Sequence, residues 1–519
     1  MKLFNLHVVV IICEILTKVS GNLKRNLLCN LRTDPCKCEH NTLDLSGRNL
    51  RHLAHLLFPN GTTCINFNNN NFRTLDCTDW LYLPKSLKCV FFKNCKIQHI
   101  ADNDSFAHLP ELYMFDVSYN NLTEQSFRNV LESVAGSHVE SLDISGFPLN
   151  SRLSNTLFSV LQKLKELYMD ECNISSLQPI LGTNTTNHYL TELHMKRNLI
   201  TETSLETFYK YGNYYPKLCI LKLSSNPIAK LLPGMFSRLR TLRKLWLDNL
   251  HSRSTTFPGV KSSTLQWLDI SNSFLFHPVE NCQDVFKSSH NLTVLNLTGI
   301  NLSTNWSETK LLRLFLPLKS INTLILSNTS MKIIPSDVFN EIDSLQVLDL
   351  SRNAIEEWKT QCFQNMSKRF KELYLNDNCI SVITETTFPL TLLQQLTTLH
   401  LNGNNFRCDC AMHWFRYWMK ANYRKLDGLS KCRSPPEYNN TRFIDFDPYY
   451  EYCFGFSLAV EIALFIAGIC FVFIWGINLV SMIRSHFLSK GCIPIINSKA
   501  KLFWILLSKF ILKNNRFIT

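Results

Sequence analysis

One repeating pattern constrains this chain more than any other feature. The motif L-x-x-L-x-L-x-x-N-x-L recurs about fifteen times between Leu43 and Phe406, with about 25 residues per repeat. Leu345–Ile355 is a clear copy. A single unit cannot bury its apolar side alone, whereas stacked neighbours share a continuous core. The chain is therefore predicted to form a solenoid, a shape that offers a binding surface rather than a catalytic cleft.

The short L-x-L segment of each repeat alternates as a strand with one buried side does. Its leucines point into the coil, and the residues between them face the inner, concave wall. The asparagine of the motif is expected to bend the chain off the strand and to form hydrogen bonds with neighbouring backbone groups. Cys95 and Cys172 occupy this position in two units. These features predict an α/β leucine-rich-repeat solenoid, or horseshoe, of about 15 repeats with cysteine caps, plus one transmembrane helix.

Composition excludes several classes of protein. Among the 519 residues, 45% are hydrophobic and 18% are charged, which is incompatible with a disordered chain. The formal net charge of +13 comes from scattered residues and a basic C-terminal tail, so nucleic acid is not indicated as a partner.

Two apolar segments predict the topology. Residues 1–21 have the pattern of a signal peptide, and Ile462–Ile483 is an uncharged stretch long enough to span a bilayer. Basic residues follow the second segment, which places the repeats outside and the C-terminus in the cytosol. The predicted order is signal peptide 1–21, N-terminal cysteine cap 22–41, leucine-rich repeats 42–406, C-terminal cysteine cap 407–453, transmembrane helix 454–483 and short cytoplasmic tail 484–519.

Cysteines and glycosylation sequons agree with an oxidising exterior. Sixteen of the nineteen cysteines lie between the leader and the membrane segment. Twelve N-x-[ST] sequons lie in the same stretch, at Asn60, Asn103, Asn121, Asn173, Asn184, Asn291, Asn296, Asn301, Asn305, Asn328, Asn365 and Asn439. Asn296 stands between two core leucines, so we expect it on the concave wall, where a glycan would shield its coil.

The cysteines after the last repeat form a specific pattern, with Cys408 and Cys410 one residue apart, an aromatic segment containing Trp414 and Trp418, and then Cys432 and Cys453. This pattern resembles the C-terminal cysteine cap of extracellular leucine-rich proteins. The resemblance implies bridges Cys408–Cys432 and Cys410–Cys453, with the tryptophans covering the last coil. Zinc is the competing interpretation of four cysteines, and the oxidising compartment favours disulfides.

At the other end, Cys29, Cys36 and Cys38 suggest the matching N-terminal cap, whose fourth cysteine is not obvious. Cys64 and Cys89 occupy the same column of adjacent coils, where they could pair, but sequence does not fix the connectivity.

The leader, the Phe-bearing repeats, the C-terminal cap and the adjacent membrane helix together resemble a Toll-like receptor ectodomain and transmembrane helix. Toll-like receptors also resemble one another in a cytosolic TIR domain, which needs well over a hundred residues. Residues 484–519 are too few for such a core. We therefore expect a form without a TIR domain, either an accessory or decoy receptor or a truncated product, and the sequence leaves both open.

A ligand surface is predicted on the concave wall. In consecutive repeats one column reads Tyr168, His194, Lys222 and Trp246, and neighbouring columns add Arg243, Lys244 and Trp267. Aromatic and cationic groups together suit an acidic or sugar-bearing ligand, or the hot spot of a protein partner. The alternative interpretation is that any fifteen-coil surface shows such a cluster.

No catalytic, cofactor-binding or metal-binding motif stands out, so no enzyme and no cofactor is predicted. The resemblance implies a pattern-recognition receptor of Toll-like type in innate immune signalling. It would be a type I single-pass plasma-membrane protein, with an endosomal membrane as the other location. Its partners would be a microbial or danger-associated ligand, or a protein partner, and a related receptor in a homo- or heterodimer. The alternative is a leucine-rich-repeat cell-adhesion or matrix-interaction membrane protein.

Overall fold

The computed structural model describes residues 42–488, except 55, 102–105, 150–160, 162, 178–188, 251–256, 274–284, 304–305, 335–337, 340–341, 359–361, 365, 427–429 and 447–449. The chain divides into two units, residues 1–446 and residues 447–519. The signal peptide and the N-terminal cap predicted from the sequence lie outside the described residues.

The first unit is built on one parallel sheet of fifteen short strands, stacked almost in chain order. Each strand has three residues and belongs to one repeat, which confirms the predicted solenoid of about fifteen repeats. The strands are β1 (Thr42–Asp44), β2 (Cys64–Asn66), β4 (Cys89–Phe91), β6 (Met114–Asp116), β7 (Ser141–Asp143), β8 (Glu166–Tyr168), β9 (Glu192–His194), β10 (Ile220–Lys222), β11 (Lys244–Trp246), β12 (Trp267–Asp269), β13 (Val294–Asn296), β14 (Thr323–Ile325), β16 (Val347–Asp349), β18 (Glu372–Tyr374) and β19 (Thr398–His400).

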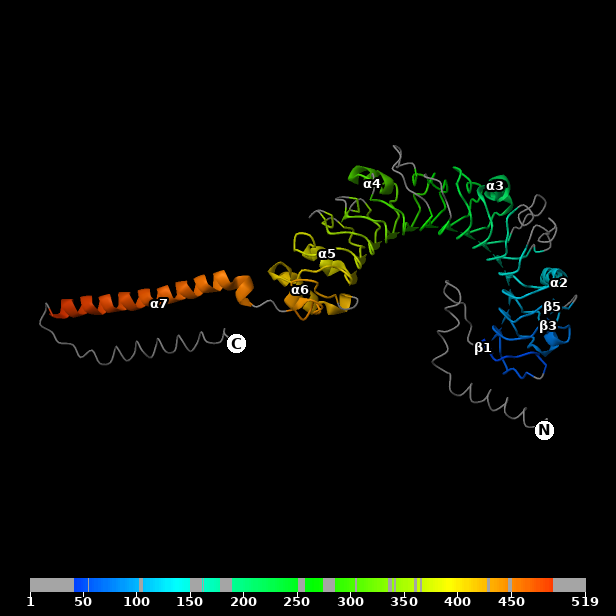
Figure 1. The fold of residues 1–519 in the computed structure, drawn as a ribbon, viewed down its shortest axis with the longest axis horizontal. Helices are drawn as coiled ribbons and strands as arrows, with labels where there is room; N and C mark the ends of the chain where they lie inside the picture. The colour runs from blue at the N-terminus through cyan, green and yellow to red at the C-terminus, as the bar shows by residue number, and fades with distance from the viewer. Residues whose placement is uncertain are drawn as a thin grey trace, which may run out of the picture. The chain divides into compact units, whose positions relative to one another are not determined.

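The strands line the inner side of a curved stack, and most return segments with helices lie on the outer side (Figure 1). These helices are α2 (Glu124–Ala135), α3 (Glu202–Tyr211), α4 (Glu308–Phe315) and α5 (Leu390–Gln395), with 3-10 turns η2 (Asp79–Tyr82) and η3 (Gly212–Tyr214). Two small parallel sheets pair β3 (Thr74–Leu75) with β5 (His99–Ile100) and β15 (Ile333–Ile334) with β17 (Glu357–Trp358). The return side is bulkier than the strand side, so the stack curves.

The repeat spacing sets the register of the sheet. Each strand pairs with the next without a shift, so equivalent residues of successive repeats stand in columns, as Leu193, Leu221 and Leu245 do. These three leucines are fully buried. The residues on either side of each central leucine therefore face the inner wall, as the alternation predicts.

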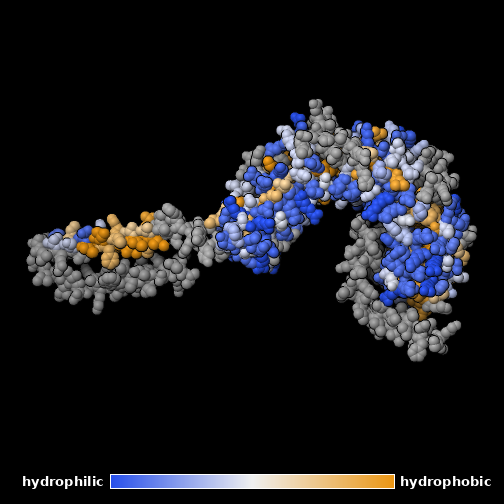
Figure 2. Space-filling model, viewed as in Figure 1, coloured by the Kyte–Doolittle hydropathy of each residue, from blue (hydrophilic) through white to orange (hydrophobic). Residues whose placement is uncertain are grey.

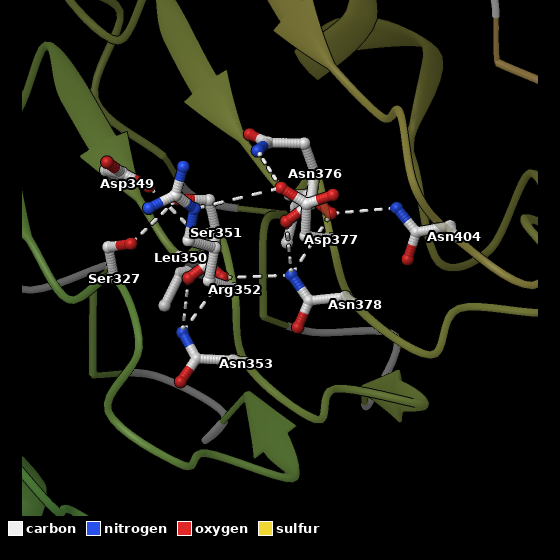
Figure 3. Close-up of polar contacts among 11 residues, drawn as sticks. Ser327, Asp349, Leu350, Ser351, Arg352, Asn353, Asn376, Asp377, Asn378 and Asn404 are labelled. Atoms are coloured by element: carbon white, nitrogen blue, oxygen red, sulfur yellow. Dashed lines mark hydrogen bonds and ion pairs between the residues drawn. The ribbon is translucent and has the colours of Figure 1, made fainter. Parts of the chain in front are cut away.

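Asparagines form the predicted polar ladder along the edge of the sheet (Figure 3). Asn378 Nδ2 donates to the carbonyls of Leu350 and Leu375, and its Oδ1 accepts from Ile355 N–H at 3.1 Å. Asn404 Nδ2 likewise donates to the carbonyl of Leu375. Each amide thus satisfies backbone groups of its own coil and of the preceding one, which the turn would otherwise leave buried and unpaired.

The two cysteines at ladder positions make a weaker version of the same contact. Cys95 Sγ lies 3.1 Å from the carbonyl oxygen of Phe67, and Cys172 Sγ lies 3.5 Å from that of Ile144. Burial raises the pKa of each thiol to about 12, so both are protonated donors at neutral pH. The substitution is tolerated because a thiol still donates to the carbonyl of the preceding coil.

A cysteine-bridged cap follows the last repeat. It contains α6 (His413–Ala421) and the 3-10 turns η5 (Cys410–Met412), η6 (Tyr423–Lys425) and η7 (Pro436–Tyr438). Cys408 and Cys432 form a disulfide with their Cα atoms 5.6 Å apart. The Trp414 indole donates to the carbonyl of Ile383 at 3.2 Å. The aromatic helix therefore covers the open end of the stack.

The second unit contains one long helix, α7 (Tyr450–Leu488). Its segment Ile462–Leu479 is long and apolar enough to cross a membrane, and none of it is buried within the protein. Figure 2 shows this hydrophobic surface on α7, whereas the visible face of the solenoid is largely hydrophilic. By length and composition this segment is a candidate membrane span.

Candidate functional site: an aromatic and basic surface on the concave wall

The register brings the predicted ligand residues together on five adjacent strands, β8 to β12. Tyr168, His194, Lys222 and Trp246 are direct neighbours in one column of the sheet. In the next column Lys244 is the register partner of Trp267. We call these six residues, with Arg243, the concave patch.

At one end of the concave patch an aromatic pair lies beside two carboxylates. The rings of Tyr168 and His194 lie 4.2 Å apart between centroids at 61°. The Tyr168 hydroxyl donates to Glu166 at 3.3 Å, and His194 Nε2 lies 3.4 Å from a Glu192 carboxylate oxygen. His194 is only 6% exposed. Tyr168 is therefore the more accessible ring of the pair, and His194 lies buried against it.

At the other end of the patch two indole rings lie side by side, and a lysine ammonium group lies over one of them. Lys222 Nζ is 4.8 Å from the centre of the Trp246 ring, and the Trp246 and Trp267 rings lie 5.6 Å apart at 31°. The Trp267 indole N–H is buried and has no acceptor among the residues that the structure describes. These two half-buried indoles form an aromatic platform on the inner wall.

The remaining two candidates lie where the chain enters β11. Arg243 is exposed and Lys244 is half-buried. The Arg243 carbonyl accepts the N–H groups of Gln266 and Trp267, which fixes the backbone at this point. The two basic side chains thus extend the positive charge of Lys222 toward the strand entry.

Acidic residues beside the patch were missed by the sequence analysis. Burial raises the pKa of Asp170, although the N–H and charge of Lys196 and the charge of Lys222 oppose the shift. Burial also raises the pKa of Asp269, against hydrogen bonds from Ser271 and Asn296. The patch is therefore a mixed surface, in which basic groups stand above partly buried carboxylates.

A second tyrosine–histidine pair was also missed. Tyr374 on β18 and His400 on β19 are register partners, and their rings stack with centroids 4.1 Å apart at 16°. The signal was present in the sequence, because both tyrosines stand in a Glu-Leu-Tyr strand and both histidines end the next strand. It is only visible once the strands are aligned by repeat.

The sequons fall into two environments. Those in the described part of the chain, apart from Asn296, have exposed asparagines, namely Asn60, Asn121, Asn173, Asn291, Asn301, Asn328 and Asn439. Asn296 is half-buried on β13, in the column of Trp246 and Asp269. Asn103, Asn184, Asn305 and Asn365 lie outside the described residues.

The cysteine predictions are resolved in part. Besides the Cys408–Cys432 disulfide, Cys410 is also disulfide-bonded. The side chain of its predicted partner Cys453, and all of Cys29, Cys36 and Cys38, lie outside the described part of the chain. Cys64 and Cys89 are register partners on β2 and β4, as their shared column predicts. Among the described residues, no group of three His, Cys, Asp or Glu side chains could hold a metal ion.

The fold is a leucine-rich-repeat solenoid with one long parallel sheet on its inner wall. The leucine rich repeat family matches residues 344–406. Transforming growth factor beta activator LRRC33 of Danio rerio is 26% identical over 385 residues, 72% of this chain and 50% of that protein. CD180 antigen of Homo sapiens is 29% identical over 227 residues (42% and 30%), and Toll-like receptor 7 of Mus musculus is 25% identical over 370 residues (54% and 34%).

The chain thus matches half or less of the length of each of these relatives. Among solved structures, the mouse RP105/MD-1 complex aligns with a TM-score of 0.47 at 18% identity, over 75% of this chain and 76% of that one. The chain carries leucine-rich repeats that are homologous to those of Toll-like receptors and CD180.

Proposed function

We propose that this protein is a single-pass cell-surface receptor of Toll-like type, which binds a ligand or a partner receptor through the inner wall of its repeats. The repeats are homologous to those of receptors. The apolar, fully exposed segment of α7 supports membrane anchoring. The signal-peptide pattern, the sequons and the basic residues after the apolar segment support an orientation with the repeats outside the cell.

The observation that carries the proposal is the concave patch itself. Four consecutive strands, β8 to β11, present Tyr168, His194, Lys222 and Trp246 in one column, with an ammonium group over an indole ring. Aromatic and cationic side chains of this kind recognise acidic or sugar-bearing ligands and form the hot spots of protein partners. Microbial and danger-associated molecules include ligands of this chemistry.

Signalling would follow from association. A ligand or related receptor that joins two solenoids would bring two α7 helices together, and the signal would pass through that assembly. We propose a homo- or heterodimer on the plasma membrane, or on an endosomal membrane, that acts in innate immunity.

The binding test uses the full chain displayed on cells. The probes are a sulfated polysaccharide, a phosphorylated glycolipid in vesicles, and the ectodomains of related receptors. Tyr168→Ala combined with Lys222→Ala should reduce capture of at least one probe about tenfold or more. Tyr374→Ala combined with His400→Ala is the matched control, because it alters a similar tyrosine–histidine pair elsewhere on the same wall. Equal capture by wild type and the Tyr168/Lys222 variant would refute the concave patch as the binding surface.

The orientation of the chain is tested with epitope tags placed before the first repeat and after the last residue. Antibody staining with and without permeabilisation reports the side of the membrane on which each tag lies.

A further experiment separates the receptor from the alternative of an adhesion or matrix-interaction protein. A chain that attaches cells to matrix but activates no reporter when two copies are cross-linked would favour the adhesion function.

A further inference from the structure

The asparagine of one sequon stands beside the indole platform. Asn296 ends β13, next to Asp269 on β12, and Trp246 on β11 follows in the same column. Trp267 stands in the neighbouring column of β12. With strands about 4.8 Å apart, Trp246 lies about 10 Å from Asn296, a span within reach of the first sugars of an N-linked chain.

The Asn296 side chain has a defined orientation. Its Nδ2 donates to Asp269 Oδ2 at 3.0 Å. Its Oδ1 accepts from the N–H of Thr298 at 3.0 Å and from the Thr298 hydroxyl at 2.7 Å. The oxygen is therefore held by its own coil, whereas the nitrogen, which is the atom that carries sugar, is directed toward Asp269 on β12.

Glycosylation is compatible with these contacts. Transfer from a lipid-pyrophosphate-linked oligosaccharide breaks the bond between the sugar C1 and the phosphate oxygen, forms a C1–Nδ2 bond, and releases one Nδ2 proton. The second N–H remains and can still donate to Asp269. That contact with Asp269 would keep the attachment atom beside β12, the strand that also carries Trp267.

We infer that an N-linked glycan on Asn296 lies across the Trp267 and Trp246 rings. Sugar C–H groups pack on aromatic faces, and the two half-buried indoles offer such a surface beside the attachment atom. The glycan covers the indole end of the concave patch, so the open end at Tyr168 and Lys222 is where a ligand binds. The inference rests on the proposed exposure of the repeats to the secretory lumen.

Occupancy is measured on the full chain expressed in a eukaryotic secretory cell. Enzymatic deglycosylation in ¹⁸O water followed by peptide mass spectrometry marks each modified asparagine. Wild type and Thr298→Ser, which keeps the sequon and the hydroxyl, should be modified at Asn296, whereas Thr298→Ala should not. Modified Asn291 and Asn301 with unmodified Asn296 would overturn this inference alone. A chain modified at none of its sequons would instead contradict the proposed extracellular placement.

The position of the glycan is measured by hydroxyl-radical footprinting of tryptophan. Trp246 and Trp267 should be oxidised several-fold more slowly in wild type and in Thr298→Ser than in Thr298→Ala. The rate at Trp414, in the C-terminal cap, should be the same in all three proteins and controls for folding. A modified Asn296 with equal oxidation of both indoles in Thr298→Ser and Thr298→Ala would overturn the packing of sugar on the platform.

Discussion

The two tyrosine–histidine pairs on the inner wall have nearly the same local sequence and different surroundings. In both, a Glu-Leu-Tyr strand is followed in the next repeat by a strand that ends in histidine. Beside His194 the same strand supplies Glu192, and the rings meet at 61°. Beside His400 the equivalent residue is Thr398, and the rings stack at 16°.

Their neighbours along the sheet also differ. Next to the first pair are Lys222 and then Trp246, so the aromatic surface continues over further strands. Next to the second pair the sheet ends, and the cap begins with the bridge between Leu399 and Leu426. A repeat therefore fixes where a side chain stands, and the chemistry of the surface depends on the residues in the adjacent repeats.

Substitutions in the ladder beneath the two pairs should give the largest difference in local stability between the two regions. Asn378→Ala removes four hydrogen bonds to backbone groups of two coils and should cost about 3 kcal/mol of local stability. Cys172→Ala, at the equivalent position under Tyr168, removes two weak thiol contacts and should cost about 1 kcal/mol. Hydrogen exchange of the strands in the detergent-solubilised full chain measures both. Equal losses would show that the thiol replaces the amide fully.

Removal of the two histidine rings should give the next largest difference in local stability. His194→Ala empties a buried position between Tyr168 and Lys222 and should cost about 2 kcal/mol. His400→Ala removes a stacked but half-buried ring and should cost about 1 kcal/mol. Local exchange rates in β8–β9 and in β18–β19 report each loss separately, and each variant serves as the control for the other. A larger loss at His400 would contradict the larger stability contribution expected for the buried His194.

The sequence predicts the framework well because the repeat has a strict spacing. The buried leucines, the asparagine ladder and the column of Tyr168, His194, Lys222 and Trp246 all follow from aligning one repeat with the next. The sequence does not predict how deeply a side chain is buried or which side chains of neighbouring coils it contacts. The burial of His194, the carboxylates Asp170 and Asp269, and the orientation of Asn296 arise from side chains of neighbouring repeats, which no single motif contains.

The two pairs should also differ, by a smaller amount, in how the local stability of their strands depends on pH. Asp170 follows the Tyr168 strand, and Asn376 stands at the equivalent position after Tyr374. Because burial raises the pKa of Asp170, its protonated form favours the folded state. That contribution is full below the unfolded pKa of about 3.9 and is lost as pH rises through the folded pKa. Asp170→Asn should therefore stabilise β8–β9 at pH 7, by less than the loss in His194→Ala.

The advantage of Asp170→Asn over wild type should shrink toward pH 4. Asn376→Asp is the reciprocal variant, and it places a carboxylate beside Asp377, whose own carboxylate now accepts from Asn376 at 3.0 Å. It should destabilise β18–β19 at pH 7. Exchange rates measured between pH 4 and pH 7, corrected for intrinsic exchange, test both variants. A difference between Asp170→Asn and wild type that grows as pH falls would contradict the sign.

The smallest expected effect concerns the contact that extends the first pair and has no equivalent at the second. Lys222 lies over the Trp246 ring, both side chains are half-buried, and a cation–π contact that is still partly in water contributes about 0.5 to 1 kcal/mol. Lys222→Met keeps the alkyl chain and removes the charge. A double-mutant cycle with Trp246→Leu should give a coupling of that size in the local stability of β10–β11. If the two losses are instead additive, the ammonium is not held by the ring, and the proposed role of Lys222 in binding would rest on its charge alone.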